Sequence, residues 1–213
     1  MPVSAPSAPP RLVLGSSSPY RRELLARLGQ PFDTRSPDVD ETPQPGETPL
    51  ALACRLAELK ARVVAQGFED DVVVIGSDQV ADLAGRPLGK PGNHAAAVAQ
   101  LRALSGQVVR FHTAVCVARP RTGQVLQAVS SVTVEFRVLS DELIETYLQR
   151  EQPYDCAGSA KCEGLGIVLL ERIDSTDPTA LVGLPLIVTS RLLREAGWDP
   201  MAINTRESGN THG

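Results

Sequence analysis

The stretch RLVLGSSSPYRRELLARLG, residues 11–29, joins a short apolar segment directly to an amphipathic one. Residues 11–15 have the continuous apolar character of a short buried strand. A helix is predicted over 19–28, because Ser18 is a favoured N-cap, Pro19 suits the first helical position and Gly29 follows the end. A strand that leads at once into a helix indicates an α/β fold.

The rest of the chain mixes strand and helix patterns in the same way. Further helices are predicted over 49–65, 93–104, 140–150 and 185–196, and further strands over 72–76, 108–118, 125–138 and 165–171. The two longest strand-like runs meet at 120–123, which is typical of a hairpin, so the sheet should be mixed. The fold class predicted is α/β, with one domain over residues 11–200 and disordered tails over 1–10 and 201–213.

The composition excludes several classes of protein. The 213 residues are 42% apolar and 22% charged, which fits one globular domain or a two-lobed one. A net charge of −4 argues against a nucleic-acid polymer as partner. The longest apolar stretch, 180–188, is far shorter than the roughly 20 residues that span a membrane, and the N-terminus does not resemble a secretory signal. Four cysteines without zinc-binding spacing are expected to be free thiols in a reducing cytoplasm.

Two basic residues stand where a helix disfavours them. Arg21 and Arg22 fall in the first turn of the predicted helix 19–28, whose N-terminal end is already positive. Such an end binds anions through its free N–H groups, so the arginines indicate a site for a strongly anionic ligand such as a phosphate chain. The alternative is that they are solvated and paired with Glu23 or a nearby carboxylate.

Lys60 falls on the apolar face of the predicted helix 49–65. A lysine that points inward normally needs an anionic partner, because burying it unpaired is costly. The alternative is a side chain whose apolar stem lies at the edge of the core while its amino group reaches solvent.

Carboxylates occur in two further places. Asp78 follows the apolar run 72–76, and the end of a buried strand is where open sheets bind ligands, so Asp78 is a candidate base or metal ligand unless it is only a turn residue. Asp38, Asp40 and Glu41 lie in a proline-rich loop, where they can hold Mg²⁺ against phosphates or simply be solvated. Lys90 lies in a Gly-Lys-Pro turn that does not match a P-loop.

The order and spacing of eight short motifs resemble those of the Maf family of nucleoside triphosphate pyrophosphatases. The motifs are SSSPYRR (16–22), DVDET (38–42), RLAELKA (55–61), IGSDQV (75–80), GKP (89–91), LSG (104–106), CAGSAKCEG (156–164) and LVGLPL (181–186). The resemblance covers residues 11–200. It implies a two-lobed domain with a long mixed sheet, similar to the inosine triphosphate pyrophosphatases. Proteins of this kind are often dimeric, so the resemblance also suggests a homodimer.

The family's activity is cleavage between the α- and β-phosphates of a nucleoside triphosphate, which releases pyrophosphate. The resemblance implies that Asp78 is the proton acceptor and that Glu41 and Asp78 hold a divalent metal, Mg²⁺ or Mn²⁺. It assigns phosphate binding to four further residues, namely Ser16, Arg21, Lys60 and Lys90.

Three positions distinguish substrate groups within the family, and here they are Tyr20, Gln79 and Glu163. Gln79 and Glu163 match the group that hydrolyses 7-methyl-GTP to 7-methyl-GMP, which removes modified nucleotides, and Tyr20 retains the aromatic character of the tryptophan found there. The group that acts on dTTP and UTP has Arg, Thr and Gln instead. A positively charged methylated guanine would be attracted to an aromatic face, and Glu163 would accept hydrogen bonds from the base.

Other functions remain open at this point. The chain can be a Maf pyrophosphatase of the dTTP and UTP type, or a regulator of septum formation and cell division that acts through protein contacts. A module that binds nucleotides without hydrolysing them is a further alternative. The sequence favours the hydrolase, because every charged position of the family site is filled.

Overall fold

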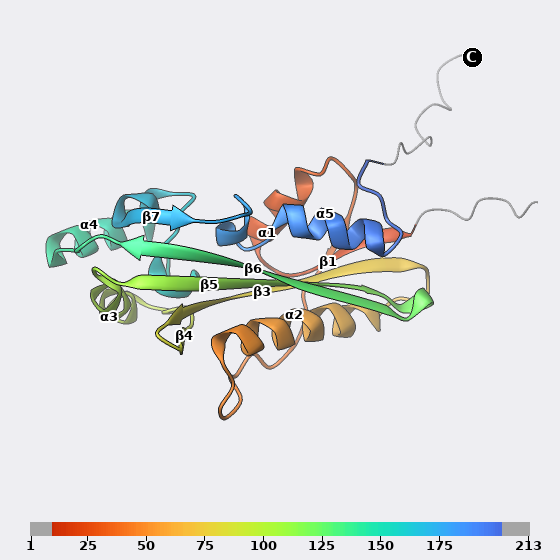
Figure 1. Cartoon of the computed structure of the whole chain (residues 1–213), viewed down its shortest axis with the longest axis horizontal. Coiled ribbons are helices and arrows are strands. Elements are labelled where there is room, and N and C mark those ends of the chain that lie inside the picture. Colours follow the sequence, from red (N-terminus) through yellow and green to blue (C-terminus); the bar gives the residue numbers. More distant parts are fainter. Residues whose placement is uncertain (1–9, 202–213) are drawn as a thin grey trace, which may run out of the picture.

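The computed structural model describes residues 10–201 and shows a seven-stranded mixed sheet with five α-helices (Figure 1). The strands are β1 (Arg11–Gly15), β2 (Asp33–Arg35), β3 (Val72–Leu83), β4 (Arg86–Leu88), β5 (Val108–Arg119), β6 (Gln124–Phe136) and β7 (Leu170–Asp174). The α-helices are α1 (Pro19–Ala26), α2 (Pro49–Ala65), α3 (His94–Leu104), α4 (Asp141–Glu151) and α5 (Leu186–Glu195). Residues 1–9 and 202–213, which make up most of the two expected tails, lie outside the described residues.

The strand order is β2-β1-β3-β5-β6-β7, with β4 paired to β3. The β1 strand pairs in parallel with β2 and β3, whereas the other pairs are antiparallel. The mixed sheet predicted from the sequence is therefore confirmed, and so is the hairpin between the two long strands β5 and β6.

Helices cover both faces of the sheet at the end where β1 lies (Figure 1). On one face α2 packs on Val72 and Val74, and on the other α1 and α5 pack on Val73 and Ile75. Alternate residues of β3 thus enter two different cores. This explains why the run 72–75 is continuously apolar instead of alternating.

A second core lies at the other end of the long strands. There α3 and α4 contribute Leu101, Ile144 and Leu148, which pack with Phe111 of β5 and Phe136 of β6. Figure 1 shows α3, α4 and β7 together at that end, away from α1, α2 and α5. The molecule is therefore two-lobed, and β3, β5 and β6 run through both lobes.

Most predicted helices agree with the structure because their caps are encoded locally. Ser18, Thr48, Asn93 and Ser140 each accept a hydrogen bond from a backbone N–H of the first turn. The predicted helix 49–65 matches α2 at both ends. Within residues 10–201, no helix has the length and apolar character needed to cross a bilayer.

Two strand predictions were wrong. The run 165–171 begins as a 3-10 helix (Leu165–Leu169), because Gly166 N bonds to Lys161 O and Glu151 accepts from Leu165 N, and the strand is instead β7. The strand that starts at Val72 does not end at Gly76 but continues to Leu83, because β5 pairs with it beyond the point where β1 ends. The sequence also gave no sign of the short strands β2 and β4.

Candidate active site

A cavity of about 270 Å³ collects side chains from both lobes. Its lining includes eight of the residues that the sequence singled out, namely Ser16, Tyr20, Arg21, Glu41, Lys60, Gln79, Lys90 and Glu163. Asp78 joins the same group through its hydrogen bond to Lys60. Residues that are scattered along the chain therefore converge on one pocket.

Lys60 lies between two carboxylates. Its Nζ is 2.6 Å from Asp78 Oδ1 and 2.5 Å from Glu41 Oε1, and its side chain is only 5% exposed. The prediction of an inward lysine with an anionic partner is confirmed, and the alternative of an amino group in solvent is wrong. A buried ammonium needs such partners, because an unpaired buried charge is strongly destabilising.

Close packing of α2 on β3 brings Lys60 to Asp78. A side chain at Gly76 would place its Cβ 2.2 Å from Ala57 O and 2.5 Å from Ala61 N. Only glycine therefore allows the helix to approach the strand this closely. Asp78 itself lies inside β3, opposite Ala114 of β5, and not beyond the end of a strand as expected. It is two residues beyond Gly76, where the parallel pairing with β1 stops.

Charges around the pocket favour the ionised form of Glu41. Burial by itself would raise the pKa of this carboxyl, but the hydrogen bond and charge of Lys60, with the charges of Lys90 and Arg21, hold the pKa below its ordinary value. Glu41 is therefore a carboxylate at neutral pH, although its side chain is 53% exposed.

Arg21 lies at the start of α1 and points into the pocket region. Its Nε donates a hydrogen bond of 2.9 Å to Gly183 O. Burial lowers the pKa of Arg21, and the charges of Asp78 and Glu41 oppose that shift; an arginine stays protonated under such conditions. Glu23 instead faces Arg27 at 3.8 Å, so the alternative of an Arg21–Glu23 pair is wrong.

The two arginines of the motif have different surroundings. Arg22 is exposed and does not belong to the pocket lining. Ser16, in contrast, is buried, and its Oγ accepts from Ser18 N at 3.1 Å. The N-terminal end of α1 therefore opens onto the pocket, with Ser16 and Ser18 ordering the turn that leads into it.

Lys90 reaches the pocket from an ordered turn between β4 and α3. Gln100 donates to Gly89 O at 2.9 Å, and Gly92 N donates to Tyr154 O at 3.0 Å. Gln100 also accepts from Ser159 Oγ at 2.6 Å. One amide side chain thus links the Lys90 turn to the segment 155–163, which also lines the pocket.

Gln79 is held by its amide nitrogen. Nε2 lies 2.9 Å from Thr113 Oγ1, 3.0 Å from Ala180 O and 3.1 Å from Leu181 O. Thr113 in turn donates to Ala180 O at 2.9 Å. Because the nitrogen is used on protein acceptors, the amide oxygen is the group that Gln79 can offer to a ligand.

The segment 155–163 adds acidic side chains to the pocket lining. Asp155 and Glu163 both line it. Lys161 pairs with Glu151 at 2.9 Å. Its Nζ also lies 5.5 Å from the centre of the Tyr20 ring. Burial raises the pKa of Tyr20, with smaller effects from its neighbours.

Only one carboxylate of the acidic loop belongs to the pocket. Glu41 lines it, whereas Asp38 is exposed and Asp40 turns away to accept from Thr42 N at 2.9 Å. For Asp38 and Asp40 the structure therefore agrees with the alternative of solvated carboxylates. Asp40 shapes the loop because a short side chain after a turn bonds to the backbone two residues on.

Some residues of the pocket were not anticipated from the sequence. Asp155 and Phe111 belong to its lining, and the backbone carbonyls at 180–183 accept from the side chains that surround it. Asp155 directly precedes the small-residue motif 156–164, so its position next to that motif was the one available signal.

The residues fit a divalent metal only together with a substrate. Within the described part of the chain, no group of three or more His, Cys, Asp and Glu side chains is arranged to hold a metal. Glu41 and Asp78 nevertheless place two carboxylates on either side of the Lys60 ammonium. Mg²⁺ is commonly held by one or two carboxylates plus substrate phosphates and water, and this donor set satisfies that pattern.

The chain is similar to several known proteins. The family model described as Maf-like protein matches residues 11–196. A relative from Polaromonas sp. strain JS666, named 7-methyl-GTP pyrophosphatase, is 64% identical over 186 residues, which cover 87% of this chain and 84% of the relative. One from Albidiferax ferrireducens with the same name is 61% identical over 187 residues, which cover 88% and 94%. A solved structure of a HAM1 protein from Coxiella burnetii has a TM-score of 0.42 and 19% identity, over 60% of this chain and 73% of that one.

Proposed function

The chain belongs to the Maf-like protein family, and we propose that it is a pyrophosphatase that hydrolyses 7-methyl-GTP to 7-methyl-GMP and pyrophosphate. The names of its relatives from Polaromonas and Albidiferax support this substrate. The observation that supports it most is a division of charge along one pocket. Arg21, Lys60 and Lys90 all act on Glu41, and we call this group the phosphate end of the pocket. Asp155 and Glu163 come from the lining segment 155–163, close to Tyr20, and we call this group the base end.

The cationic end suits a triphosphate. Three cations and the N-terminal end of α1 would neutralise the phosphates and the charge that develops on the leaving pyrophosphate. Ser16, in the turn before α1, would add a hydroxyl at the same end. Lys60 would exchange part of its contact with Glu41 or Asp78 for a phosphate oxygen.

Asp78 is proposed as the proton acceptor. Lys60 binds Asp78 Oδ1, so Oδ2 is the oxygen from which a water molecule could be oriented. The water oxygen would bond to the α-phosphorus, and its proton would pass to Asp78. The bond from the α-phosphorus to the bridging oxygen would break, and pyrophosphate would leave with that oxygen.

Glu41 and Asp78 are proposed to hold Mg²⁺ or Mn²⁺ when the nucleotide is bound. A divalent cation at this position would neutralise phosphate charge. The contribution of the chain is to keep both carboxylates close together through Lys60, while Lys60, Lys90 and Arg21 favour the ionised form of Glu41 by lowering its pKa.

The acidic end suits a methylated guanine. Gln79 offers an amide oxygen and Glu163 a carboxylate, which are two acceptors for the adjacent N–H donors of guanine. Thymine and uracil have a single N–H donor between two carbonyl oxygens, so they match this pair poorly. Methylation at N7 adds a positive charge, which Asp155, Glu163 and the Tyr20 ring would attract.

A nucleotide panel tests the proposal. Pyrophosphate release is measured with 7-methyl-GTP, GTP, dTTP and UTP in the presence of Mg²⁺ or Mn²⁺. We expect 7-methyl-GTP to have the highest kcat/KM. A preference for dTTP or UTP would replace this substrate by the alternative one, and binding of nucleotide without pyrophosphate release would show a binding module.

Two further expectations remain proposals. A homodimer rests on the family resemblance, and a cytoplasmic location rests on Cys54, Cys116, Cys156 and Cys162, all of which are free thiols. A role in cell division through protein contacts would be favoured over catalysis only if the nucleotide panel gave no product.

A further inference from the structure

We propose that Arg55 is a positioning residue that holds the acidic loop, residues 36–48, so that Glu41 stays beside Lys60. This inference rests on the proposed function, because it gives Glu41 its task at the phosphate end of the pocket. Arg55 itself does not line the pocket. Its effect on the reaction would therefore pass through the loop.

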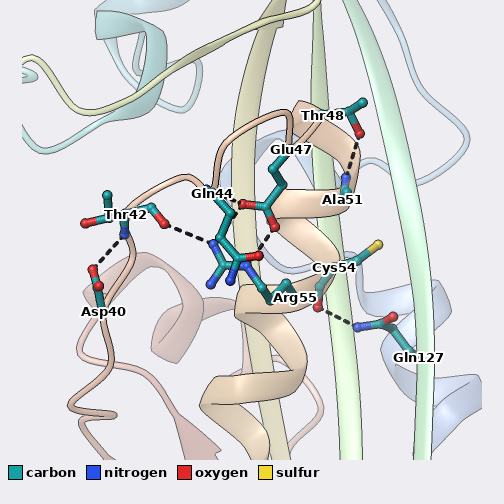
Figure 2. A network of polar contacts seen from close by, with 9 residues as sticks. All are labelled: Asp40, Thr42, Gln44, Glu47, Thr48, Ala51, Cys54, Arg55 and Gln127. Atoms are coloured by element: carbon teal, nitrogen blue, oxygen red, sulfur yellow. Dashed lines mark hydrogen bonds and ion pairs between the residues drawn. The ribbon is translucent and has the colours of Figure 1, made fainter.

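Arg55 binds two parts of the loop at once (Figure 2). Its Nε and one terminal nitrogen donate to the two carboxylate oxygens of Glu47 at 2.7 and 2.8 Å. The same terminal nitrogen donates to Thr42 O at 3.1 Å. This planar, two-pronged contact needs a guanidinium, because a lysine ammonium cannot match both carboxylate oxygens in that geometry.

The contact also shifts the ionisation of Glu47. The side chain of Glu47 is only 8% exposed, and its hydrogen bonds to Arg55, with one from Gln44 N, lower its pKa from 4.5 to about 2. A lowered carboxyl pKa means that the contact stabilises the fold fully above about pH 4.5 and is lost as the pH falls toward 2. At neutral pH the contact between Arg55 and Glu47 is therefore intact. We call the contacts of Arg55 with Glu47 and Thr42 the clamp.

Glu41 directly precedes Thr42, whose carbonyl accepts a hydrogen bond from Arg55. Asp40 accepts from Thr42 N, so a local turn encloses Glu41 and ties it to that contact. No helix or strand forms between Arg35 and Pro49. Side-chain hydrogen bonds therefore order this loop, as backbone hydrogen bonds order the helices and strands. Without them Glu41 would regain conformational freedom.

Arg55 and Lys60 belong to the same helix, α2, but serve two different contacts. Lys60 reaches Asp78 in the sheet, and Arg55 reaches the loop that contains Glu41. The helix thus sets the position of both carboxylates that flank Lys60. Without Arg55 we expect Lys60 to keep Asp78 and to lose Glu41 for part of the time.

The first experiment measures the loop without nucleotide or metal. Hydrogen exchange over residues 40–47 is followed by mass spectrometry in the full-length protein and in Arg55→Ala. We expect exchange there to become about tenfold faster, because charged hydrogen bonds are lost. Arg62→Ala is the matched control, since Arg62 on the same helix pairs with Glu58 at 2.7 Å on the surface, and it should leave this segment unchanged.

The second experiment measures pyrophosphate release from 7-methyl-GTP. In Arg55→Ala we expect KM and the half-saturating metal concentration to rise about tenfold, while kcat changes less than about threefold. Arg55→Lys should recover part of the effect, and Glu47→Gln should resemble Arg55→Ala with a smaller change. The shape of the pH profile should stay the same.

Three outcomes would decide the matter. Unchanged exchange at 40–47 in Arg55→Ala would overturn the inference. So would a loss of kcat with unchanged KM and metal dependence, because that would indicate general damage to the fold. If the wild-type protein releases no pyrophosphate, the proposed function fails, but faster exchange in Arg55→Ala would still establish the clamp.

Discussion

The two ends of the pocket are built in different ways. The phosphate end takes Lys60 and Asp78 from the middle of α2 and β3, where hydrogen-bonded backbone and a close helix–strand contact fix them. The base end takes Glu163 from an irregular segment and fixes Gln79 through backbone carbonyls of another, 180–183. The pair proposed to carry the chemistry is thus held by regular elements, whereas Glu163, which is proposed to choose the base, is held by an irregular segment.

The phosphate end should account for the largest effects. We expect Asp78→Asn to lower kcat by about 10²–10⁴-fold, because the proton acceptor is lost. The fold should persist, since asparagine can still accept from Lys60. Pyrophosphate release and thermal unfolding measure the two effects separately, and normal turnover would show that Asp78 has another role.

Lys90→Ala tests whether the phosphate end is indifferent to the base. We expect kcat/KM to fall about 10–100-fold, by a similar factor for 7-methyl-GTP and GTP, because a charged phosphate contact is lost. Arg86→Ala serves as control, since Arg86 is exposed on β4 and outside the pocket lining. A fall in kcat/KM for only one of the two nucleotides would show that Lys90 also takes part in recognising the base.

Glu163→Gln tests the base end. We expect the preference for 7-methyl-GTP over GTP to fall about fivefold to tenfold, because an ionised acceptor becomes neutral. The kcat for GTP should change little. Glu171→Gln, at an exposed residue on β7, is the control. If both substrates lose activity equally, Glu163 does not select the base.

Thr113→Val should have the smallest effect. It removes the hydroxyl that accepts from Gln79 Nε2, while Ala180 O and Leu181 O still hold the amide. We expect discrimination between 7-methyl-GTP and UTP to fall about twofold to fivefold. Thr189→Val is the control, because it also removes a buried hydroxyl, one that donates to Pro185 O at 2.7 Å and lies outside the pocket lining. It shows how much a loss of stability by itself changes the ratio. An unchanged ratio would mean that Thr113 does not help to orient Gln79.

Local sequence patterns predicted one part of the site and left another part unpredicted. The inward direction of Lys60 follows from helical periodicity, which is a local property. Ser18 and Pro19 marked the start of α1 for the same reason. The resemblance to a family then supplied residues such as Lys90 and Glu163, which no local pattern had placed in a common pocket.

Nonlocal contacts decided the features that were missed. Asp78 lies inside β3 because β5, some 36 residues further on, continues the pairing opposite Ala114. Residues 165–169 have the composition of a strand, but the backbone of Gly166 packs so closely on Lys161 that the chain turns there. The contact between Arg55 and Thr42 likewise joins a helix to a loop, and helical spacing alone does not reveal it.

Hydrolysis in ¹⁸O-labelled water tests the central claim most directly. The cations at the phosphate end, with Asp78 orienting the water, are proposed to direct attack at the α-phosphorus. The account predicts that the label appears in 7-methyl-GMP and that the released pyrophosphate is unlabelled. Label in the pyrophosphate, or release of labelled orthophosphate instead, would contradict it.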